Sequence, residues 1–159
     1  MWWFLDTLVV EHELDDARDV FVFEQLLPEG ASPPLHVHDG LDDSFYLLEG
    51  RIVVRRGGEL LLAEPGSWVS VPRGTPHTFR VLDGSARMLL VHDDASYRDL
   101  VHDVGTPAGR PTLPEPTGGP GLEHLTQALV DHDSRVVGPS MSEDEARSFV
   151  LGAGVGGPR

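Results

Sequence analysis

Apolar positions in the first ninety residues fall into short runs that are rich in β-branched and aromatic side chains. Residues 20–27 run into Pro28, and residues 44–48 stop at Gly50. Runs of this length between turn-forming residues predict β-strands. The same pattern predicts further strands over residues 68–71, 77–82 and 86–91. Many short strands at this spacing favour a β-sandwich or barrel.

A pair of glycines marks one β-hairpin. Residues 51–56 and 59–63 are rich in Val, Ile and Leu, and Gly57 and Gly58 lie between them. Glycine tolerates the positive φ values of the primed turns that join antiparallel strands. We therefore predict two paired strands joined by a two-residue turn.

The pattern changes beyond Asp93. A helix is predicted from Asp94 or Ser96 through His102, closed by Gly105. Residues 106–121 are rich in proline and glycine, which predicts a linker or a strap on the surface.

Two more helices are predicted near the C-terminus. An amphipathic helix over residues 121–133 is indicated by apolar residues at helical spacing, namely Leu122, Leu125, Leu129 and Val130. Ser142 and Glu145 form a capping box ahead of a third helix, and Gly152 is expected to stop that helix.

The length of 159 residues suits one domain with its own core. No internal repeat is visible. We predict a mainly β fold with a single barrel over residues 1–93. Residues 94–159 then form a helical, Pro- and Gly-rich extension packed on the barrel within the same domain.

The chain is strongly acidic, with a net charge of −14, and it contains no cysteine. Such a surface repels phosphate backbones and anionic lipid headgroups, so nucleic acid and membranes are not expected partners. Without cysteine, neither disulfides nor thiolate metal sites can form. Any metal must therefore be bound through nitrogen and oxygen.

The N-terminal run from Met1 to Leu5 is apolar, but Asp6 interrupts it. It lacks the basic leader and the small-residue cleavage site of a signal peptide. No apolar stretch approaches the roughly 18 residues that span a bilayer. We therefore expect a cytoplasmic protein.

His36 and His38 are two residues apart in a segment between Pro34 and Gly40. Residues i and i+2 of a strand share one face, so both imidazoles can converge on one ion. A pair of exposed histidines on a sheet surface is the alternative for this motif taken alone.

Other glycine, proline, histidine and aspartate residues lie at short intervals around this histidine pair. Gly30, His36, His38, Asp43 and Gly50 follow one another as G-x5-H-x-H-x4-D-x6-G. A second set reads G-x5-P-x-G-x2-H, from Gly66 through Pro72 and Gly74 to His77. Together they resemble the two signature motifs of the cupin superfamily, with eight Gly, His and Pro positions matched and no insertion.

The resemblance implies a jelly-roll β-barrel that holds one divalent metal through His36, His38 and His77, with Asp43 as the carboxylate. Imidazole and carboxylate ligands suit Fe, Mn, Ni, Cu, Co or Zn without selecting among them. Asp43 stands where the family usually has Glu, and Val81 where it usually has Asn. The shorter Asp43 can ligate directly, bind through a water, or act as a base beside the metal.

Strand alternation predicts which side chains surround the ion. Phe45 and Leu47 share the face of Asp43, and Phe79 and Val81 share the face of His77. These four would line an apolar chamber for an aromatic or hydrophobic oxygenated ligand, or else would only fill the barrel.

His92 ends a predicted strand and can reach the barrel mouth. For the other histidines, which lie among acidic residues, exposed or capping roles are expected: His12, His102, His124 and His132.

Within the cupins, the segments around His36, Phe45 and His77 look most like bacterial single-domain quercetin-dioxygenase-like proteins. This resemblance implies a dioxygenase acting on an enol or polyphenol, with Asp43 taking the substrate's hydroxyl proton. It also implies a homodimer, in which residues 2–8 supply an edge strand or contact. Because cupins host many chemistries, two alternatives remain: a metal-assisted cyclase, isomerase or hydrolase acting on polyketide-like or β-dicarbonyl compounds, and a non-catalytic metal-containing small-molecule-binding protein.

Overall fold

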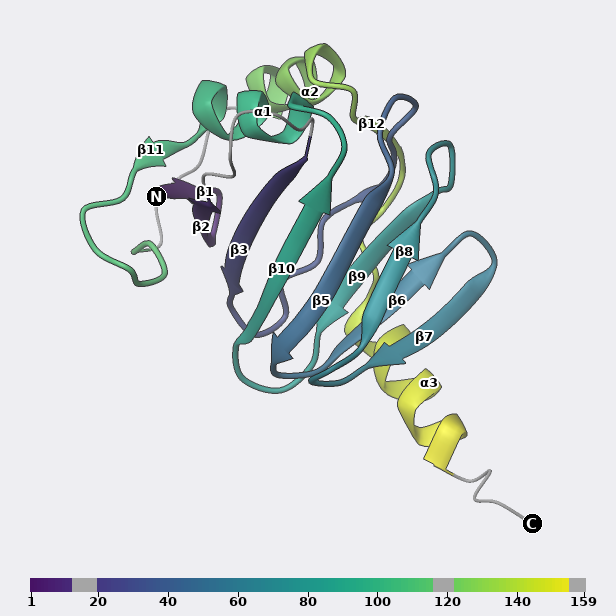
Figure 1. The fold of residues 1–159 in the computed structure, drawn as a ribbon. Helices are drawn as coiled ribbons and strands as arrows, with labels where there is room; N and C mark the ends of the chain where they lie inside the picture. The colour runs from purple at the N-terminus through teal and green to yellow at the C-terminus, as the bar shows by residue number, and fades with distance from the viewer. Residues whose placement is uncertain (13–19, 116–121, 155–159) are drawn as a thin grey trace.

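The computed structural model describes residues 1–12, 20–115 and 122–154, and it contains two antiparallel β-sheets packed face to face (Figure 1). Their inner faces enclose the main hydrophobic core. This architecture confirms the predicted mainly β, cupin-type fold with C-terminal helices.

The larger sheet has seven strands among the described residues. Its order is β11 (Thr106–Pro107), β1 (Trp2–Phe4), β2 (Thr7–His12), β3 (Phe21–Leu27), β10 (Ala86–His92), β5 (Asp43–Glu49) and β8 (Trp68–Val71).

The smaller sheet has five strands in the same part of the chain. Its order is β12 (Arg135–Gly138), β4 (Leu35–Val37), β9 (His77–Val81), β6 (Ile52–Arg56) and β7 (Glu59–Ala63). The β6–β7 hairpin forms as predicted, with Gly57 at a φ of +57°.

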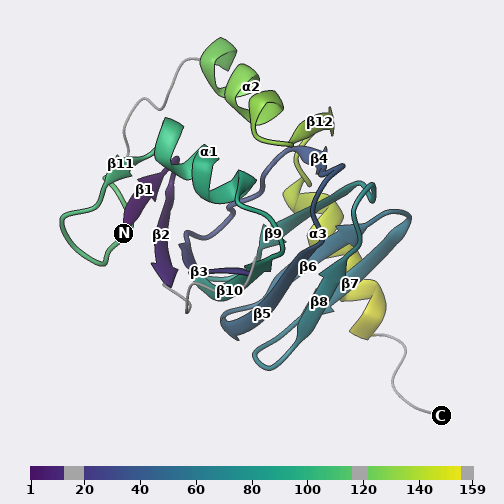
Figure 2. The same cartoon turned by 45° about the horizontal axis from the view of Figure 1, so that its top comes forward.

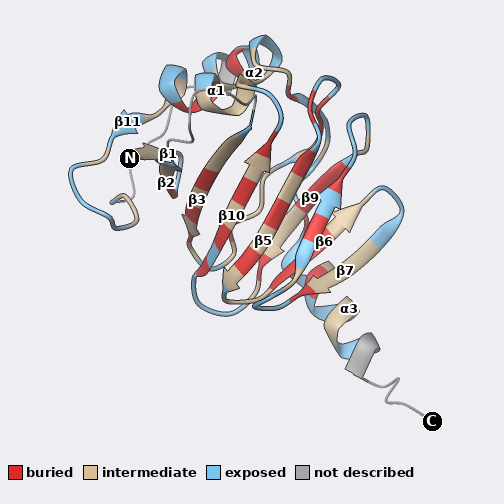
Figure 3. Ribbon diagram, in the orientation of Figure 1, coloured by how far each residue is buried: buried red, intermediate tan, exposed pale blue. Residues whose placement is uncertain are grey.

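Burial alternates along the strands as a half-buried sheet requires (Figure 3). On β5, Asp43, Phe45 and Leu47 are buried, while Ser44 and Tyr46 between them are half-buried. The period of two therefore places Asp43 on the inner face beside the core.

The helices lie at two different places on the sandwich. α1 (Ser96–Val104) and α2 (Leu122–Asp131) lie next to each other at one end (Figures 1 and 2). α3 (Glu143–Gly154) covers the outer face of the smaller sheet. There Met141 and Ala146 form a second buried cluster with Val53 of β6.

The helix-end signals are confirmed at two positions and wrong at one. The backbone N–H of Gly105 donates to the Val101 carbonyl at the end of α1. Ser142 Oγ accepts from the Glu145 N–H, 3.2 Å away, at the start of α3. Gly152 does not stop α3, which continues to Gly154. A glycine inside a helix costs only about 1 kcal/mol, so it does not by itself end one.

The region between α1 and α2 begins with β11, and Trp3 Nε1 donates to the Thr112 carbonyl at 2.8 Å. That much of the predicted strap lies on the N-terminal strands; residues 116–121 lie outside the described residues. None of the helices in the described ranges has the length and apolar character needed to cross a bilayer.

Candidate metal centre

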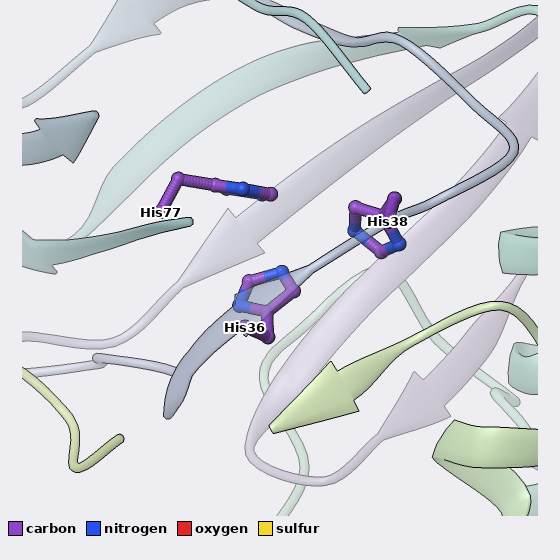
Figure 4. A group of neighbouring side chains, drawn as sticks. All are labelled: His36, His38 and His77. Carbon is purple, nitrogen blue, oxygen red and sulfur yellow. The ribbon is translucent and has the colours of Figure 1, made fainter. Parts of the chain in front are cut away.

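Strand register brings the three predicted histidines together. His36 on β4 and His77 on β9 are direct cross-strand partners, with ring centroids 4.2 Å apart. His38 lies one residue beyond β4, and its ring centroid is 4.9 Å from that of His36 and 5.3 Å from that of His77. One ring nitrogen from each residue lies within 4.8 Å of the other two (Figure 4).

Each of these imidazoles is anchored to the backbone through Nδ1. His36 Nδ1 lies 2.8 Å from the Pro34 carbonyl oxygen, and His77 Nδ1 lies 2.9 Å from that of Thr75. A carbonyl oxygen only accepts hydrogen bonds, so each Nδ1 carries the proton. Nε2 is then left with its lone pair, which is the form that binds a metal.

His38 is held from a distant part of the chain. Its Nδ1 lies 3.0 Å from the Asp133 carbonyl oxygen and 3.3 Å from Ser134 Oγ. Residues 133 and 134 form the turn between α2 and β12. The C-terminal extension therefore fixes the orientation of one of the three histidines.

Burial keeps two of these histidines, His36 and His38, in the neutral form at pH 7. Burial, followed by the nearby His77 and His38, lowers the pKa of His36 to about 3. Burial also lowers the pKa of His38, although Asp43 opposes this change. Neutral imidazoles at pH 7 are ready to bind a metal without first releasing a proton.

Asp43 lies beside this group but is not part of it. Its Oδ1 accepts a hydrogen bond from His92 Nε2 at 3.0 Å, and its Oδ2 lies 3.3 Å from His77 Nε2. Burial raises the pKa of Asp43, but the interactions with His77 and His92 outweigh it and place the pKa well below its usual range. Because His92 is the direct cross-strand partner of Asp43, the short carboxylate is engaged at the sheet and the three histidines converge without it.

One buried nitrogen indicates that a cation belongs here. Within the described residues, His77 Nε2 has no hydrogen-bond partner, although it lies close to Asp43 Oδ2. The positive charge that His77 Nε2 and Asp43 Oδ2 share is either a proton or a metal ion, and the metal ion is the one that leaves the Nδ1 proton of His77 in place. Three imidazoles whose Nδ1 atoms donate to main-chain carbonyls, set beside a carboxylate, fit one divalent transition metal.

A cavity of about 710 Å³ opens beside the histidines and is lined mainly by apolar side chains. Phe45 and Phe79, predicted to line the chamber, are in its wall. Leu47 and Val81 are instead fully buried in the core and are not among the lining residues. Leu47 lies two residues beyond Phe45 on its strand, and Val81 lies two residues beyond Phe79, about 7 Å deeper into the barrel. These two side chains therefore fill the barrel interior, which was the alternative to lining the chamber.

The structure adds site residues that the sequence analysis missed or gave little weight. His92 is buried against Asp43, and Gln25 and Tyr97 form a polar pair in the cavity wall. Alternation with Leu90 and Met88 on β10 was a usable signal for His92. Among the remaining histidines, three pair with surface acids, in the pairs His12–Glu24, His102–Glu11 and His132–Asp103.

Comparison with known proteins agrees with this site. Residues 23–92, which contain His36, His38, Asp43 and His77, match the family model described as a cupin domain. These residues form a cupin domain. The predicted resemblance is thereby confirmed.

One curated relative of this cupin is quercetin 2,3-dioxygenase from Bacillus subtilis (strain 168). The two are 28% identical over 79 residues, which is 50% of this chain and 23% of the relative. The cupin therefore spans about a quarter of the length of the curated relative it matches.

Solved structures share the fold at low identity. Rru_A2000 from Rhodospirillum rubrum, a cupin-2 domain, has a TM-score of 0.51 and 17% identity, over 70% of this cupin and 68% of that chain. KdgF from Halomonas sp. has a TM-score of 0.52 and 19% identity, and the match covers 58% of this chain and 84% of KdgF.

Proposed function

We propose that this cupin is a metal-dependent dioxygenase acting on an enol- or polyphenol-containing aromatic compound. The observation that carries the proposal is a group of three backbone-anchored imidazoles, two of which, His36 and His77, line a large, mainly apolar cavity. The similarity to a quercetin 2,3-dioxygenase, which extends over half of this chain, supports the choice of reaction.

In this proposal His36, His38 and His77 hold one divalent transition metal through Nε2. When bound, such an ion supplies a Lewis acid with open positions for oxygen ligands. Both atoms of dioxygen end in the product, and the electrons come from the carbon–carbon double bond of the enol. No external reductant is therefore required.

The protein's own residues prepare the substrate. Asp43 is ionised at neutral pH, because its pKa is lowered, and its Oδ2 is the site proposed to accept the enol proton. His92 holds the other oxygen, Oδ1, in place. Phe45 and Phe79, whose ring centroids are 6.4 Å apart, offer apolar surface to an aromatic ring and keep water from it.

One observation favours a second candidate. Asp43 is already engaged by His77 and His92, which weakens it as a base. A metal-assisted cyclase, isomerase or hydrolase acting on a β-dicarbonyl compound needs the Lewis acid but consumes no oxygen. This is the second function that the site can support.

Oxygen uptake separates these functions. The metal-loaded protein is mixed with quercetin in an oxygen electrode, with the His77→Ala variant as control. The dioxygenase proposal expects uptake of one dioxygen per substrate consumed, and loss of uptake in the variant. Product formation under strict anaerobiosis would support the second candidate instead, and tight binding without turnover would indicate a binding protein.

A further inference from the structure

Two polar side chains stand in the cavity wall apart from the three histidines. Gln25 faces inward from β3 and is 6% exposed. Tyr97 reaches the cavity from α1, and its ring is fixed by near-perpendicular contacts with Phe4, Phe23 and His92 at 6.0, 5.1 and 5.4 Å. Held on three sides, the ring cannot turn its hydroxyl away from the cavity without disturbing the core.

The two side chains share a single hydrogen bond, from Gln25 Nε2 to the Tyr97 hydroxyl. Among the described residues neither side chain has another hydrogen-bond partner. An amide with two N–H groups and a phenol with one O–H supply three donor hydrogens, and the shared bond uses one. Two remain whichever way the amide is turned, and both belong to a pair that lines the cavity.

Donors that line an apolar cavity favour a ligand that satisfies them. A hydrogen-bonding site discriminates strongly because a ligand without the matching group leaves buried polar atoms unpaired. Leu27, Met88 and Leu90 in the nearby wall are apolar, and the polar residues Asp6 and Thr7 in the same wall use the Thr7 hydroxyl proton in a hydrogen bond to each other. The Gln25–Tyr97 pair is therefore the main source of unused donor hydrogens at this end of the cavity.

We propose that the Gln25–Tyr97 pair determines specificity by donating hydrogen bonds to a hydroxyl, carbonyl or phenolate oxygen of the ligand other than the oxygens at the metal centre. This inference deepens the proposed function and rests on it. It narrows the ligand class to aromatic compounds that carry oxygen at both ends.

The position of the pair along the barrel sets the shape of that ligand. Gln25 lies opposite Met88 on β10, four residues from His92, which contacts Asp43. At about 3.3 Å per residue the backbones of these two levels lie roughly 13 Å apart. The Tyr97 side chain covers part of that distance, because its ring centroid lies 5.4 Å from that of His92. A ligand that contacts both sites must therefore reach from the metal centre past His92 to the Gln25–Tyr97 hydrogen bond.

Anaerobic binding to the metal-loaded protein tests the pair without any turnover. The probes are quercetin and the unsubstituted flavonol, which shares the enol and carbonyl but lacks the other hydroxyl groups. The variants are Tyr97→Phe, which removes one hydroxyl, and Gln25→Met, which removes the amide. Tyr46→Phe is the matched control, because Tyr46 is the only other tyrosine, lies beside Trp68 and does not line the cavity.

We expect the parent protein to prefer quercetin and both cavity variants to lose about three- to tenfold in quercetin affinity, the size of one neutral hydrogen bond. Affinity for the unsubstituted flavonol and the thermal midpoint of Tyr97→Phe should stay close to those of Tyr46→Phe. An unchanged quercetin preference in Tyr97→Phe and Gln25→Met would overturn the inference, as would binding of neither flavonol. Binding with the expected preference but no oxygen uptake would overturn only the dioxygenase proposal.

Discussion

At the scale of single residues, the candidate metal centre depends on hydrogen bonds that do not touch the metal position. Each histidine donates a hydrogen bond from Nδ1 to a main-chain carbonyl. The acceptors are Pro34 for His36, Asp133 for His38 and Thr75 for His77. Main-chain acceptors are fixed by the fold, so the three Nε2 lone pairs are positioned before any ion arrives. Such preorganisation reduces the cost of ordering the ligands on binding.

Replacing His77 with alanine tests whether these imidazoles hold the ion. The variant keeps two of the three nitrogen ligands. We therefore expect its metal content to be at least tenfold lower than that of the parent protein. The measurement is elemental analysis of the two proteins after identical purification. His124→Ala is the matched control, since His124 is exposed on α2. A full metal complement in His77→Ala would remove His77 from the ligand set.

The buried pair of His92 and Asp43 leads to a second residue-scale prediction. His92→Leu takes a donor away from a buried carboxylate, which should cost about 2 kcal/mol of unfolding free energy. We expect a lower kcat with little change in metal content, because His92 orients Asp43 and does not belong to the three-histidine group.

His92→Gln supplies the comparison, because its amide N–H can replace the lost donor. Recovery of both kcat and the urea midpoint in His92→Gln, but not in His92→Leu, is the expected pattern. Equal behaviour of the two variants would mean that the hydrogen bond to Asp43 has no role.

At the scale of elements, the sequence predicted best where local signals decide the structure. The glycine pair of the β6–β7 hairpin and the alternation along β3, β5 and β10 are local, and the strands formed within a residue or two of their predicted bounds. The motif histidines are a non-local contact that the family resemblance implied, and β4 and β9 place His36 opposite His77 as expected.

Elements that depend on distant partners were not predicted. β12 pairs with β4, about a hundred residues earlier in the chain, and most of its side chains are exposed. No apolar periodicity marks such a strand. The roles of Asp133 and Gln25 were equally hidden, because their partners lie more than seventy residues away.

The turn between α2 and β12 gives a prediction at this scale. Asp133 has a φ of +57°, its carbonyl anchors His38, and its Oδ2 accepts from the Gly40 N–H at 2.8 Å. Asp133→Ala loses that acceptor, and alanine pays about 1 kcal/mol more than glycine in the left-handed region. We expect metal affinity to fall by up to about tenfold through a looser His38.

Two matched variants separate the causes. Asp133→Gly keeps the backbone conformation but loses the Oδ2 acceptor, and Asp133→Asn keeps an acceptor together with tolerance of the left-handed region. Titration with Zn²⁺ should rank the affinities as parent and Asn above Gly, and Gly above Ala. An alanine variant that binds as tightly as the parent would show that the turn does not position His38.

At the scale of the whole molecule, both edges of the N-terminal strand are already used. β1 lies between β2 and β11, and Trp2 stacks on His102 with ring centroids 4.4 Å apart. The apolar N-terminus is thus partly covered by its own chain. Homodimer formation through residues 2–8 stays a prediction, and it now requires the short edge strand β11 to take part.

Acid stability is the last prediction and concerns the folded molecule as one thermodynamic unit. The pKa of His36 falls from 6.5 to about 3 on folding, and that of His38 also falls. Between these values the unfolded chain binds more protons than the folded one, so stability rises with pH in this window. The stability that these two histidines contribute is fully present above about pH 6.5 and is lost as the pH falls toward 3. Asp43 acts in the same direction below its ordinary value of 3.8.

For the metal-free protein, we expect the unfolding free energy from urea titration to drop by about 2 kcal/mol or more between pH 6.5 and pH 4.5, mainly through His36 and His38. His36→Asn removes one of these groups, so its stability should depend less steeply on pH in the same window. Because protons compete with the ion for the same Nε2 lone pairs, the drop should be larger when Zn²⁺ is present at a constant concentration. Equal stability of the parent protein at both pH values would mean that the fold does not hold these imidazoles neutral. It would contradict the inference that the metal centre is preorganised.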